Sequence, residues 1–458
     1  MKPGEYQAFI AGKSFRHVEA GFDCDELDYP LFDYQVPIVR WALKRGKAAV
    51  FADTGLGKTI MQLAWADQVA RRTGKPVLVL APLAVSNQTI EEGAKYGISV
   101  NKADPGSPAT GAMIVITNYE QLHKFNPCDY IGVVLDESSI LKGMDGRRRR
   151  EITDFAHSIQ YRLSCTATPS PNDFMELGTQ SEFLGIMSQI EMLAMFFIHD
   201  GGDVAKWRLK GHGQSKFFQW LATWAIVIRK PDDLGFDGSR HALPPIVYHS
   251  HVIETDPQDS LFVEPAQGLQ DRNKARKDSV RDRVAKAAEI ANSMDGQVLI
   301  WCHLNEESEM LTALVRDAVE VKGADAPEHK TKSLMGFAHG DVRVMVSKPK
   351  IAGFGMNWQN CNQMIFVGLS DSWESYYQAI RRCWRFGQTK HVHVHVVSAD
   401  TEGAVIENIQ RKDQQNKVLG ESMVDHMKTM MDKSIFAAAT TKTEYNPKIK
   451  MEIPQWLM

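Results

Sequence analysis

Short aliphatic runs recur along the first third of the chain, and longer polar stretches separate them. Between residues 48 and 168 the runs are AAVFA, PVLVLAP, AMIVIT, YIGVVLDE and YRLSCTAT. Continuous apolar runs of this length are typical of strands buried on both faces of a parallel sheet, and the polar stretches between them suit crossover helices. The pattern therefore predicts an α/β domain.

A second series of the same kind follows in the C-terminal half: QVLIWCH, VRVMVSK, QMIFVGL and VHVHVVSA. Helical spacing again separates the strand-like runs, as in Val280, Val284, Ala287, Ala288 and Ala291. Two tandem α/β domains are the simplest account of the doubled series.

Residues 174–228 interrupt the rhythm, because ELGTQSEFLGIMSQIEMLAMFF and FFQWLATWAIVI are long apolar stretches that suit helices. We expect them to form a helical insertion packed outside the first sheet. Glycine, proline and charge over residues 229–245 are typical of an exposed connection. The predicted boundaries are domain one over 1–232, a linker over 233–245, domain two over 246–415 and a loosely held tail over 416–458.

Composition limits the functional classes. The chain has 458 residues and 43% hydrophobic content, and its 53 Lys plus Arg against 56 Asp plus Glu leave a charge of −3, so a nucleic acid would need a localised groove. The start lacks a signal-peptide pattern, and no stretch holds roughly 18 consecutive apolar residues, so we expect a cytoplasmic protein without membrane contact. Six scattered cysteines without a CxxC pair argue against a zinc site.

A phosphate-binding loop is predicted at ADTGLGKT, residues 52–59, between a strand-like run and a helix-compatible stretch. Gly55 and Gly57 allow backbone N–H groups to approach phosphates, and the helix N-terminus adds a favourable dipole. Lys58 would contact the β- and γ-phosphates, and Thr59 would ligate Mg²⁺. Taken alone, the loop has an alternative interpretation, a turn that happens to end in GKT.

An acidic pair, Asp136 and Glu137, ends the apolar run YIGVVLDE. Buried carboxylates need a partner cation. Asp136 can hold Mg²⁺ through its water shell, and Glu137 can position and deprotonate an attacking water. By itself such a pair is often a helix cap, but the upstream phosphate loop favours the catalytic interpretation.

Two arginines in YYQAIRRCWRFGQ, Arg382 and Arg385, lie three positions apart and share one helix face. Both guanidinium groups can then reach one anionic target, such as a γ-phosphate presented by the opposite domain. A solvated basic face is the alternative. The basic run at 147–150 is equally open: it could line a DNA track or simply solvate a helix.

Three histidines, His391, His393 and His395, alternate along VHVHVV and therefore share one face of a strand. A metal site there is not favoured, because no further ligand is evident.

These motifs resemble those of superfamily 2 helicases, which carry an AxxGxGKT loop followed by a DExx box. YYQAIRRCWRFGQ resembles the QAxxRxxRxGQ signature of their Swi/Snf-type translocase branch, and LSCTATPSPNDFMEL is similar to motif III of that branch. The resemblance implies two RecA-like domains with a helical insertion, ATP and Mg²⁺ in the site, and movement along DNA. Duplex DNA is favoured by these motifs and by the IRK stretch at 228–230, while RNA stays possible.

The resemblance also implies roles for single residues. Catalysis is expected from Lys58, Asp136, Glu137, Arg382 and Arg385. Nucleotide binding is expected from a FDYQ element like the glutamine motif and from matching loop positions: Gln35, Thr54, Gly55, Gly57, Lys58, Thr59, Gly355 and Gln378. Sequence-independent contacts to the nucleic-acid backbone are expected from Pro82, Thr117, Asn118, Tyr119 and Ser347. Coupling of hydrolysis to movement is expected from Thr166, Ala167 and Thr168.

Three features depart from the Swi/Snf pattern: the acidic box ends in Ser138 and Ser139, TATP replaces the usual GTP, and Trp384 replaces a common histidine. Two other functions stay open. The first is a strand-unwinding DNA or RNA helicase, and the second is a catalytically silent, ATP-regulated clamp or scaffold. The compact chain favours a phage or prokaryotic motor, which would act in the host cytoplasm if phage-encoded.

Overall fold

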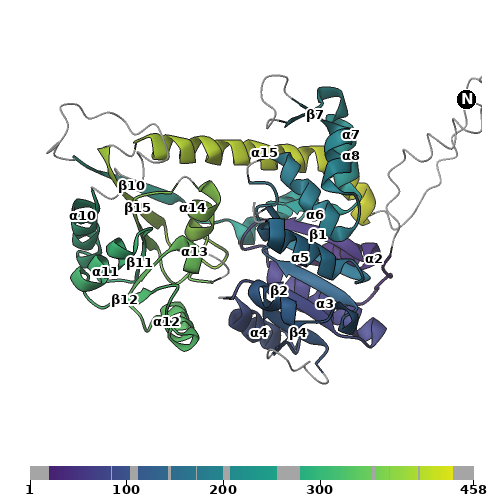
Figure 1. The fold of residues 1–458 in the computed structure, drawn as a ribbon, viewed down its shortest axis with the longest axis horizontal. Helices are drawn as coiled ribbons and strands as arrows, with labels where there is room; N and C mark the ends of the chain where they lie inside the picture. Colours follow the sequence, from purple (N-terminus) through teal and green to yellow (C-terminus); the bar gives the residue numbers. More distant parts are fainter. Residues whose placement is uncertain are drawn as a thin grey trace, which may run out of the picture.

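The computed structural model describes residues 20–83, 85–103, 112–142, 146–171, 173–199, 207–254, 279–352, 356–370, 372–400 and 403–436. Two parallel sheets follow one another along the chain, each flanked by helices (Figure 1). The predicted fold class, two tandem RecA-like α/β domains, is confirmed. We call the part before residue 246 lobe one and the part from 246 to 400 lobe two.

Lobe one is built on a seven-stranded sheet with the order β3-β4-β2-β5-β6-β1-β9, in which all paired neighbours are parallel. The predicted runs form its centre, and the strands are β1 (Lys47–Ala52), β2 (Val77–Ala81), β3 (Asn101–Lys102), β4 (Ile114–Asn118), β5 (Gly132–Asp136), β6 (Tyr161–Thr166) and β9 (Ala225–Ile228). Parallel strands all end at one edge of a sheet, so the loops after β1, β5 and β6 meet there.

The helices of lobe one begin and end as follows: α2 (Gln35–Arg45), α3 (Lys58–Thr73), α4 (Ser86–Lys95), α5 (Gly146–Ala156), α6 (Leu177–Leu184), α7 (Gln189–Phe196) and α8 (Gln214–Ala222). Short 3₁₀ turns lie between them: η1 (Tyr119–Lys124), η2 (Pro127–Asp129), η3 (Ser138–Lys142), η4 (Phe174–Glu176), η5 (Gly211–Gly213), η6 (Pro231–Leu234) and η7 (Ser239–His241).

The predicted helical insertion over 174–228 is only partly helical. After α6 and α7 the chain forms an antiparallel pair, β7 (Phe197–His199) and β8 (Trp207–Leu209). After α8, the run Ala225–Ile228 forms β9, which joins the main sheet beside β1. The expectation that this run packs outside the sheet as helix was wrong. A fully buried run of four apolar residues has no helical or strand periodicity, so its pattern could not separate the two.

Lobe two contains a six-stranded sheet with the order β10-β15-β14-β11-β13-β12, again parallel throughout. Its strands are β10 (Ile246–Ile253), β11 (Val298–Trp301), β12 (Ala318–Val321), β13 (Val344–Ser347), β14 (Gln363–Val367) and β15 (Val392–Ala399). Its helices are α10 (Val280–Asn292), α11 (Asn305–Leu314), α12 (Pro327–His339), α13 (Pro349–Ala352) and α14 (Trp373–Ile380).

Both faces of the second sheet are buried. Along β11, Leu299 and Trp301 join one hydrophobic cluster, whereas Val298 and Ile300 join the cluster on the other face. Alternate side chains of a strand point to opposite faces, so a strand covered on both sides needs an unbroken apolar run. This requirement explains why the run VLIW has no polar position.

The predicted loose tail over 416–458 is wrong for its first half. Helix α15 (Gly403–Phe436) runs across both lobes (Figure 1, yellow). Its start packs on lobe two, where Trp373 Nε1 donates to Asp413 Oδ1 at 2.8 Å. Its later part packs into the core of lobe one through Met423, Val424 and Met427. These apolar positions are sparse among polar ones, so the pattern predicted no core; residues 437–458 lie outside the described part.

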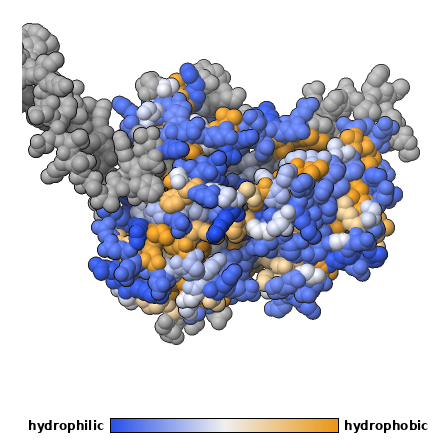
Figure 2. Space-filling model, turned by 180° about the vertical axis from the view of Figure 1, so that it is seen from behind, coloured by the Kyte–Doolittle hydropathy of each residue, from blue (hydrophilic) through white to orange (hydrophobic). Residues whose placement is uncertain are grey.

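The face seen in Figure 2 is mostly hydrophilic, with separate hydrophobic patches over both lobes. None of the helices in the described part of the chain is long and apolar enough to cross a membrane.

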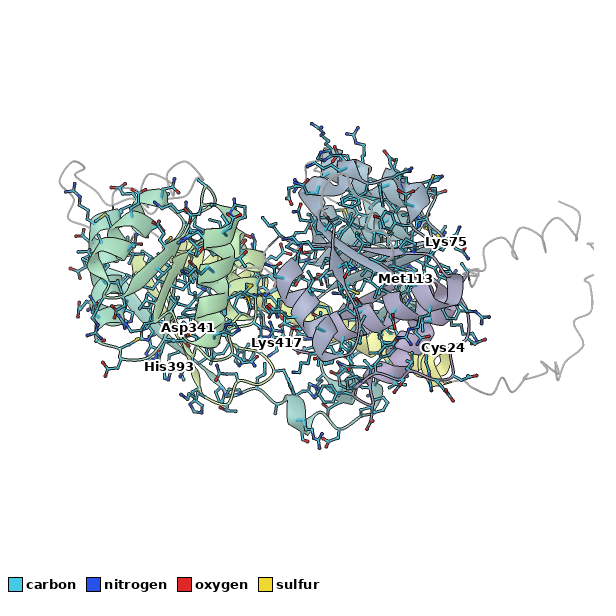
Figure 3. The ribbon with its side chains drawn as sticks, turned by 90° about the horizontal axis from the view of Figure 1, so that it is seen from below. Cys24, Lys75, Met113, Asp341, His393 and Lys417 are labelled. Atoms are coloured by element: carbon cyan, nitrogen blue, oxygen red, sulfur yellow. The ribbon has the colours of Figure 1, made fainter. Side chains whose placement is uncertain are left out.

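Histidines of two neighbouring strands form stacked pairs in lobe two. His249 Nε2 lies 3.0 Å from His393 Nδ1, and His251 Nε2 lies 3.1 Å from His395 Nδ1. The rings of His249 and His395 stack with centroids 4.4 Å apart. Figure 3 labels His393 at this position. Within the described ranges, no group of three or more His, Cys, Asp or Glu side chains is arranged to hold a metal ion.

The stacked histidines predict acid sensitivity. Burial, and then the neighbouring imidazoles of His249, His251 and His393, lower the pKa of His395 to about 4. An unfolded histidine has a pKa of about 6.5, so between about pH 6.5 and 4 the unfolded chain binds a proton that the folded chain does not. The melting temperature should therefore fall over this interval, and His395→Gln should weaken the fall. The control is His391→Gln, at an exposed position. A melting temperature that falls as steeply with pH in His395→Gln as in wild type would contradict this prediction.

Candidate active site

A cavity of about 630 Å³ lies between the lobes, next to the ends of β1 and β5. Lobe one contributes the predicted phosphate loop, the start of α3 and the acidic pair, and lobe two contributes the segment after α14. The predicted residues that line this cavity are Gln35, Thr54, Gly55, Gly57, Lys58, Thr59, Asp136, Glu137, Arg382 and Arg385.

The phosphate loop can only be built with glycine at its two close approaches. Gly55 has φ 88° and Gly57 has φ 71°, a left-handed region that favours glycine. A Cβ at Gly57 would lie 2.3 Å from Gln35 Nε2, and one at Gly55 would lie 2.9 Å from the backbone N of Phe386. Helix α3 begins directly after Gly57, so its free N–H groups and positive end face the cavity. This is the geometry of an anion site.

The Lys58 ammonium lies at the mouth of the loop. Its Nζ donates to the carbonyl of Ala52 at 2.8 Å and to that of Asp53 at 3.3 Å. Burial lowers the pKa of Lys58, and the carboxylates of Glu137, Asp53 and Asp136 oppose that change. The single ammonium of Lys58 therefore lies near three carboxylates.

Asp136 and Glu137 are both buried at the end of β5. Tyr119 OH donates to the Asp136 carbonyl at 2.6 Å and fixes the chain there. Glu137 has φ 54°, a conformation that is rare for a residue with a side chain and that often marks functional sites. Burial, and then the neighbouring Glu137, raise the pKa of Asp136 to about 7. Such adjacent acids call for a further cation.

The residues present fit a magnesium ion. Mg²⁺ prefers oxygen ligands, and it is bound through one or two carboxylates together with substrate phosphates. Asp136 and Thr59 line the same cavity as the phosphate loop. They are the residues that would hold the ion.

Arg382 and Arg385 reach the cavity from lobe two. Arg382 is buried, and its guanidinium donates to the backbone carbonyl of Gln378 at 2.9 Å and to that of Met356 at 3.2 Å. Arg385 Nη1 donates to the same Met356 carbonyl at 3.2 Å. Burial lowers the pKa of Arg382 to about 10 and also lowers that of Arg385. The two guanidinium groups are held as neighbours facing lobe one.

The side-chain amides of two glutamines predicted to contact the nucleotide, Gln378 and Gln35, are hydrogen-bonded to the protein itself. Gln378 does not line the cavity; its Oε1 accepts from Arg382 Nη2 at 2.7 Å, so it orients that arginine. Gln35 lines the cavity, but its Nε2 donates to the Leu56 carbonyl at 2.9 Å and its Oε1 accepts from Phe32 N at 2.9 Å. Its amide therefore braces the phosphate loop. Gly355 lies outside the described residues.

A second cavity of about 790 Å³ opens between the lobes beside the first. Of the residues predicted to contact nucleic acid, Pro82, Asn118 and Tyr119 line it. Cations reach it from both lobes: Lys102, Lys142 and Arg148 from lobe one, and Lys330 and Lys350 from lobe two.

Other predicted contacts do not lie in this second cavity. Ser347 is fully buried at the end of β13, where its hydroxyl donates to the Val321 carbonyl at 2.9 Å, so the expectation for it is corrected. Thr117 is buried inside β4. Within the basic run, Arg148 lines the cavity, whereas Arg147 forms an ion pair with Glu151 at 2.9 Å on the helix surface. Of these two arginines, Arg148 is the one that lies in the cavity, where it forms an ion pair with Glu120 at 3.2 Å.

The predicted coupling residues lie between the acidic pair and lobe two. Thr166 Oγ1 donates to Glu137 Oε2 at 3.4 Å and accepts from Thr168 N at 3.1 Å. Thr168 Oγ1 donates to Glu374 Oε1 of lobe two at 3.0 Å, and Ala167 lies between them on a smaller cavity. A chain of contacts therefore joins Glu137 to α14.

Sequence reasoning missed the residues that join the lobes. Glu374 forms an ion pair with Lys142, and Asp53 accepts from Tyr377 OH at 2.6 Å and pairs with Arg381 at 2.5 Å. Two signals were available in the sequence. Asp53 is an acidic residue inside the phosphate loop, and Arg381 is an arginine that the signature QAxxRxxRxGQ does not require. Each is visible in the sequence, but their pairing is not.

Residues 281–387 match the family model described as helicase conserved C-terminal domain. The SWI/SNF chromatin-remodeling complex subunit snf22 of Schizosaccharomyces pombe is 27% identical over 176 residues, which are 34% of this chain and 10% of that protein. ATP-dependent DNA helicase Q4 of Homo sapiens is 27% identical over 115 residues, 21% of this chain and 9% of that protein. The chain thus spans a small part of these two relatives.

A relative of similar length comes from a phage. Putative protein p41 of Acyrthosiphon pisum secondary endosymbiont phage 1 is 25% identical over 450 residues, 81% of this chain and 94% of that protein. A solved structure, the Sulfolobus solfataricus SWI2/SNF2 ATPase core in complex with dsDNA, aligns with 92% of this chain and 99% of that chain, at 17% identity and a TM-score of 0.41. The chain therefore carries a helicase conserved C-terminal domain and resembles the Swi/Snf-type superfamily 2 helicases, which are ATP-hydrolysing nucleic-acid motors.

Proposed function

We propose that this chain couples ATP hydrolysis to movement along duplex DNA without reading its base sequence. The observation that carries the proposal is the meeting of a phosphate loop, an acidic pair and two arginines of the other lobe around one cavity. A site completed only by both lobes makes the chemistry depend on how the lobes lie, which is what a motor requires.

The reaction proposed is attack of water on the γ-phosphate of ATP. The loop amides and Lys58 bind the phosphates, and Glu137 positions the water and accepts its proton. Arg382 and Arg385 stabilise the charge that develops on the transferred phosphoryl group, which leaves ADP and phosphate. Mg²⁺ held by Thr59 and Asp136 would neutralise charge on the β- and γ-phosphates.

The second cavity is proposed as the nucleic-acid track. Pro82, Asn118 and Tyr119 are loop or strand-end residues suited to backbone contact, and the cations opposite suit phosphates. The names of two relatives, a chromatin-remodeling subunit and a DNA helicase, support DNA, and the Swi/Snf-type motifs favour duplex. The similarity to a phage protein supports a motor that works in the host cytoplasm.

Removing two cations of the track should weaken binding to all sequences alike. Lys330→Ala with Lys350→Ala is expected to reduce the salt dependence of DNA affinity, the slope of log K against log salt, by about 2, because each phosphate contact contributes close to 0.9. Fluorescence anisotropy with two unrelated duplexes over a range of salt measures this slope. Lys286→Ala, on the outer helix α10, is the matched control. An unchanged slope would place the track elsewhere.

Triplex displacement tests movement along duplex. With ATP, the chain should displace a third strand from a duplex that it travels, and it should not do so with a non-hydrolysable analogue. Strand separation of a forked DNA or RNA without triplex displacement would favour an unwinding helicase. ATP binding without any turnover would favour the clamp or scaffold.

A further inference from the structure

The lobes are joined directly beside the ATP cavity by three side chains to which no motif assigns a role. Asp53 lies between β1 and the glycines of the phosphate loop, Tyr377 lies in α14, and Arg381 directly follows that helix. Asp53 Oδ2 lies 2.5 Å from Arg381 Nη2, and Tyr377 OH donates to Asp53 Oδ1 at 2.6 Å. Arg381 Nε also donates to Tyr377 OH at 3.1 Å. The three groups form a closed set of contacts.

Arg381 is buried, Asp53 and Tyr377 are partly buried, and the set pairs one carboxylate with one guanidinium beside a neutral phenol. Arg381 is 5% exposed, and its guanidinium lies 4.6 Å from the centroid of the Trp384 ring. Burial acts to raise the pKa of Asp53, but Arg381, Tyr377 and the Thr54 N–H together hold it below its usual value. Charge-assisted contacts with a planar guanidinium fork restrict geometry more than a flexible ammonium would. The set therefore fixes how the two lobes meet.

Its neighbours on both sides belong to the catalytic machinery. The carbonyl of Asp53 accepts from Lys58 Nζ at 3.3 Å. Arg382 directly follows Arg381, and both Arg382 and Arg385 line the ATP cavity. Arg381 itself faces a different cavity of about 330 Å³, on which Asp53 and Tyr377 also lie. A shift of this contact would move the phosphate loop relative to the two arginines.

We propose that Asp53, Tyr377 and Arg381 form an inter-lobe clasp that keeps Arg382 and Arg385 in register with the phosphate loop. The three are positioning residues, and the inference rests on the proposed ATP hydrolysis at this cavity. The clasp does not affect phosphate binding by the loop. It affects the hydrolysis step, in which Arg382 and Arg385 stabilise the charge that develops on the γ-phosphate. A misplacement of about 1 Å can cost a hundredfold in rate, so its loss should lower kcat about ten- to hundredfold. The KM for ATP should change less than about threefold, because ground-state binding is retained.

Three variants separate positioning from stability. Asp53→Asn and Arg381→Gln each remove one charge, and the double variant removes both and so leaves no buried charge unpaired. The double variant should regain most of the melting temperature that each single variant loses. Its kcat should stay as low as that of the slower single variant, because the two residues act as a unit. Arg71→Ala, which removes the 2.7 Å ion pair with Asp67 near the C-terminal end of α3, is the matched control with unchanged kcat. A kcat that recovers together with the melting temperature would overturn the proposal, as would a raised KM with unchanged kcat.

Hydrogen exchange without nucleotide tests the clasp independently of turnover. Asp53→Asn and Arg381→Gln should accelerate exchange in residues 53–59 and in residues 373–388, with the remaining peptides exchanging as in wild type. Equal exchange in wild type and variants would overturn the clasp. A wild-type chain that hydrolyses no ATP would refute the proposed function. The exchange pattern would then still show whether the clasp holds the two lobes together.

Discussion

Glu137→Gln is expected to lower kcat for ATP hydrolysis by about a hundred- to ten-thousandfold, the range typical of a lost general base. The amide keeps the shape of the side chain but cannot accept the proton of the attacking water. Glu137 lies at the end of β5 on the ATP cavity, with Thr166 donating to its carboxylate at 3.4 Å. Steady-state phosphate release measures the effect.

Binding of ATP should survive this substitution, because the loop amides and Lys58 are untouched. Glu289→Gln on the exposed face of α10 makes the same chemical change away from the cavity and should hydrolyse ATP at the wild-type rate. Turnover in Glu137→Gln within about threefold of wild type would assign the base to another residue.

Arg385→Ala is expected to cost about 10³- to 10⁵-fold in kcat, the range known for arginines that stabilise a transferring phosphoryl group. The side chain comes from lobe two, and its guanidinium is held by the Met356 carbonyl at 3.2 Å. Arg385→Lys should recover little, because an ammonium lacks the planar fork. Single-turnover hydrolysis with pre-bound ATP isolates the step.

A matched change at an exposed arginine of lobe two, Arg316→Ala, should leave single-turnover hydrolysis unchanged. A loss of ATP affinity in Arg385→Ala with an unaltered hydrolysis rate would mean that the arginine binds the ground state and takes no part in the transition state.

Most of the two sheets could be predicted from the sequence, because buried parallel strands read as apolar runs bounded by polar stretches. β1, β2, β4, β5 and β6 follow this rule. β9 does not, since only Thr223 and Trp224 separate its four apolar residues from the apolar α8, too short a break to mark a boundary. The part of α15 that bridges the lobes was missed because only a few of its residues pack into a core. Its sequence therefore has a weak hydrophobic pattern.

Most residues that line the cavity between the lobes were predictable because their motifs are local. A loop, an acidic pair and an arginine pair each carry their spacing within a few positions. The contacts between lobes are not local: Tyr377 and Asp53 are 324 positions apart, and only the fold brings them together. Gln378 and Ser347 show the converse limit, since a matching motif position does not determine which way its side chain points.

The most direct test of the central claim is steady-state ATP hydrolysis measured without nucleic acid, with duplex DNA, with single-stranded DNA and with RNA, using Glu137→Gln as the blank. The proposed duplex motor predicts that duplex DNA raises the rate most and that the blank stays flat under all four conditions. Stimulation by single strands or RNA alone, or a wild-type rate that no nucleic acid changes, would contradict it.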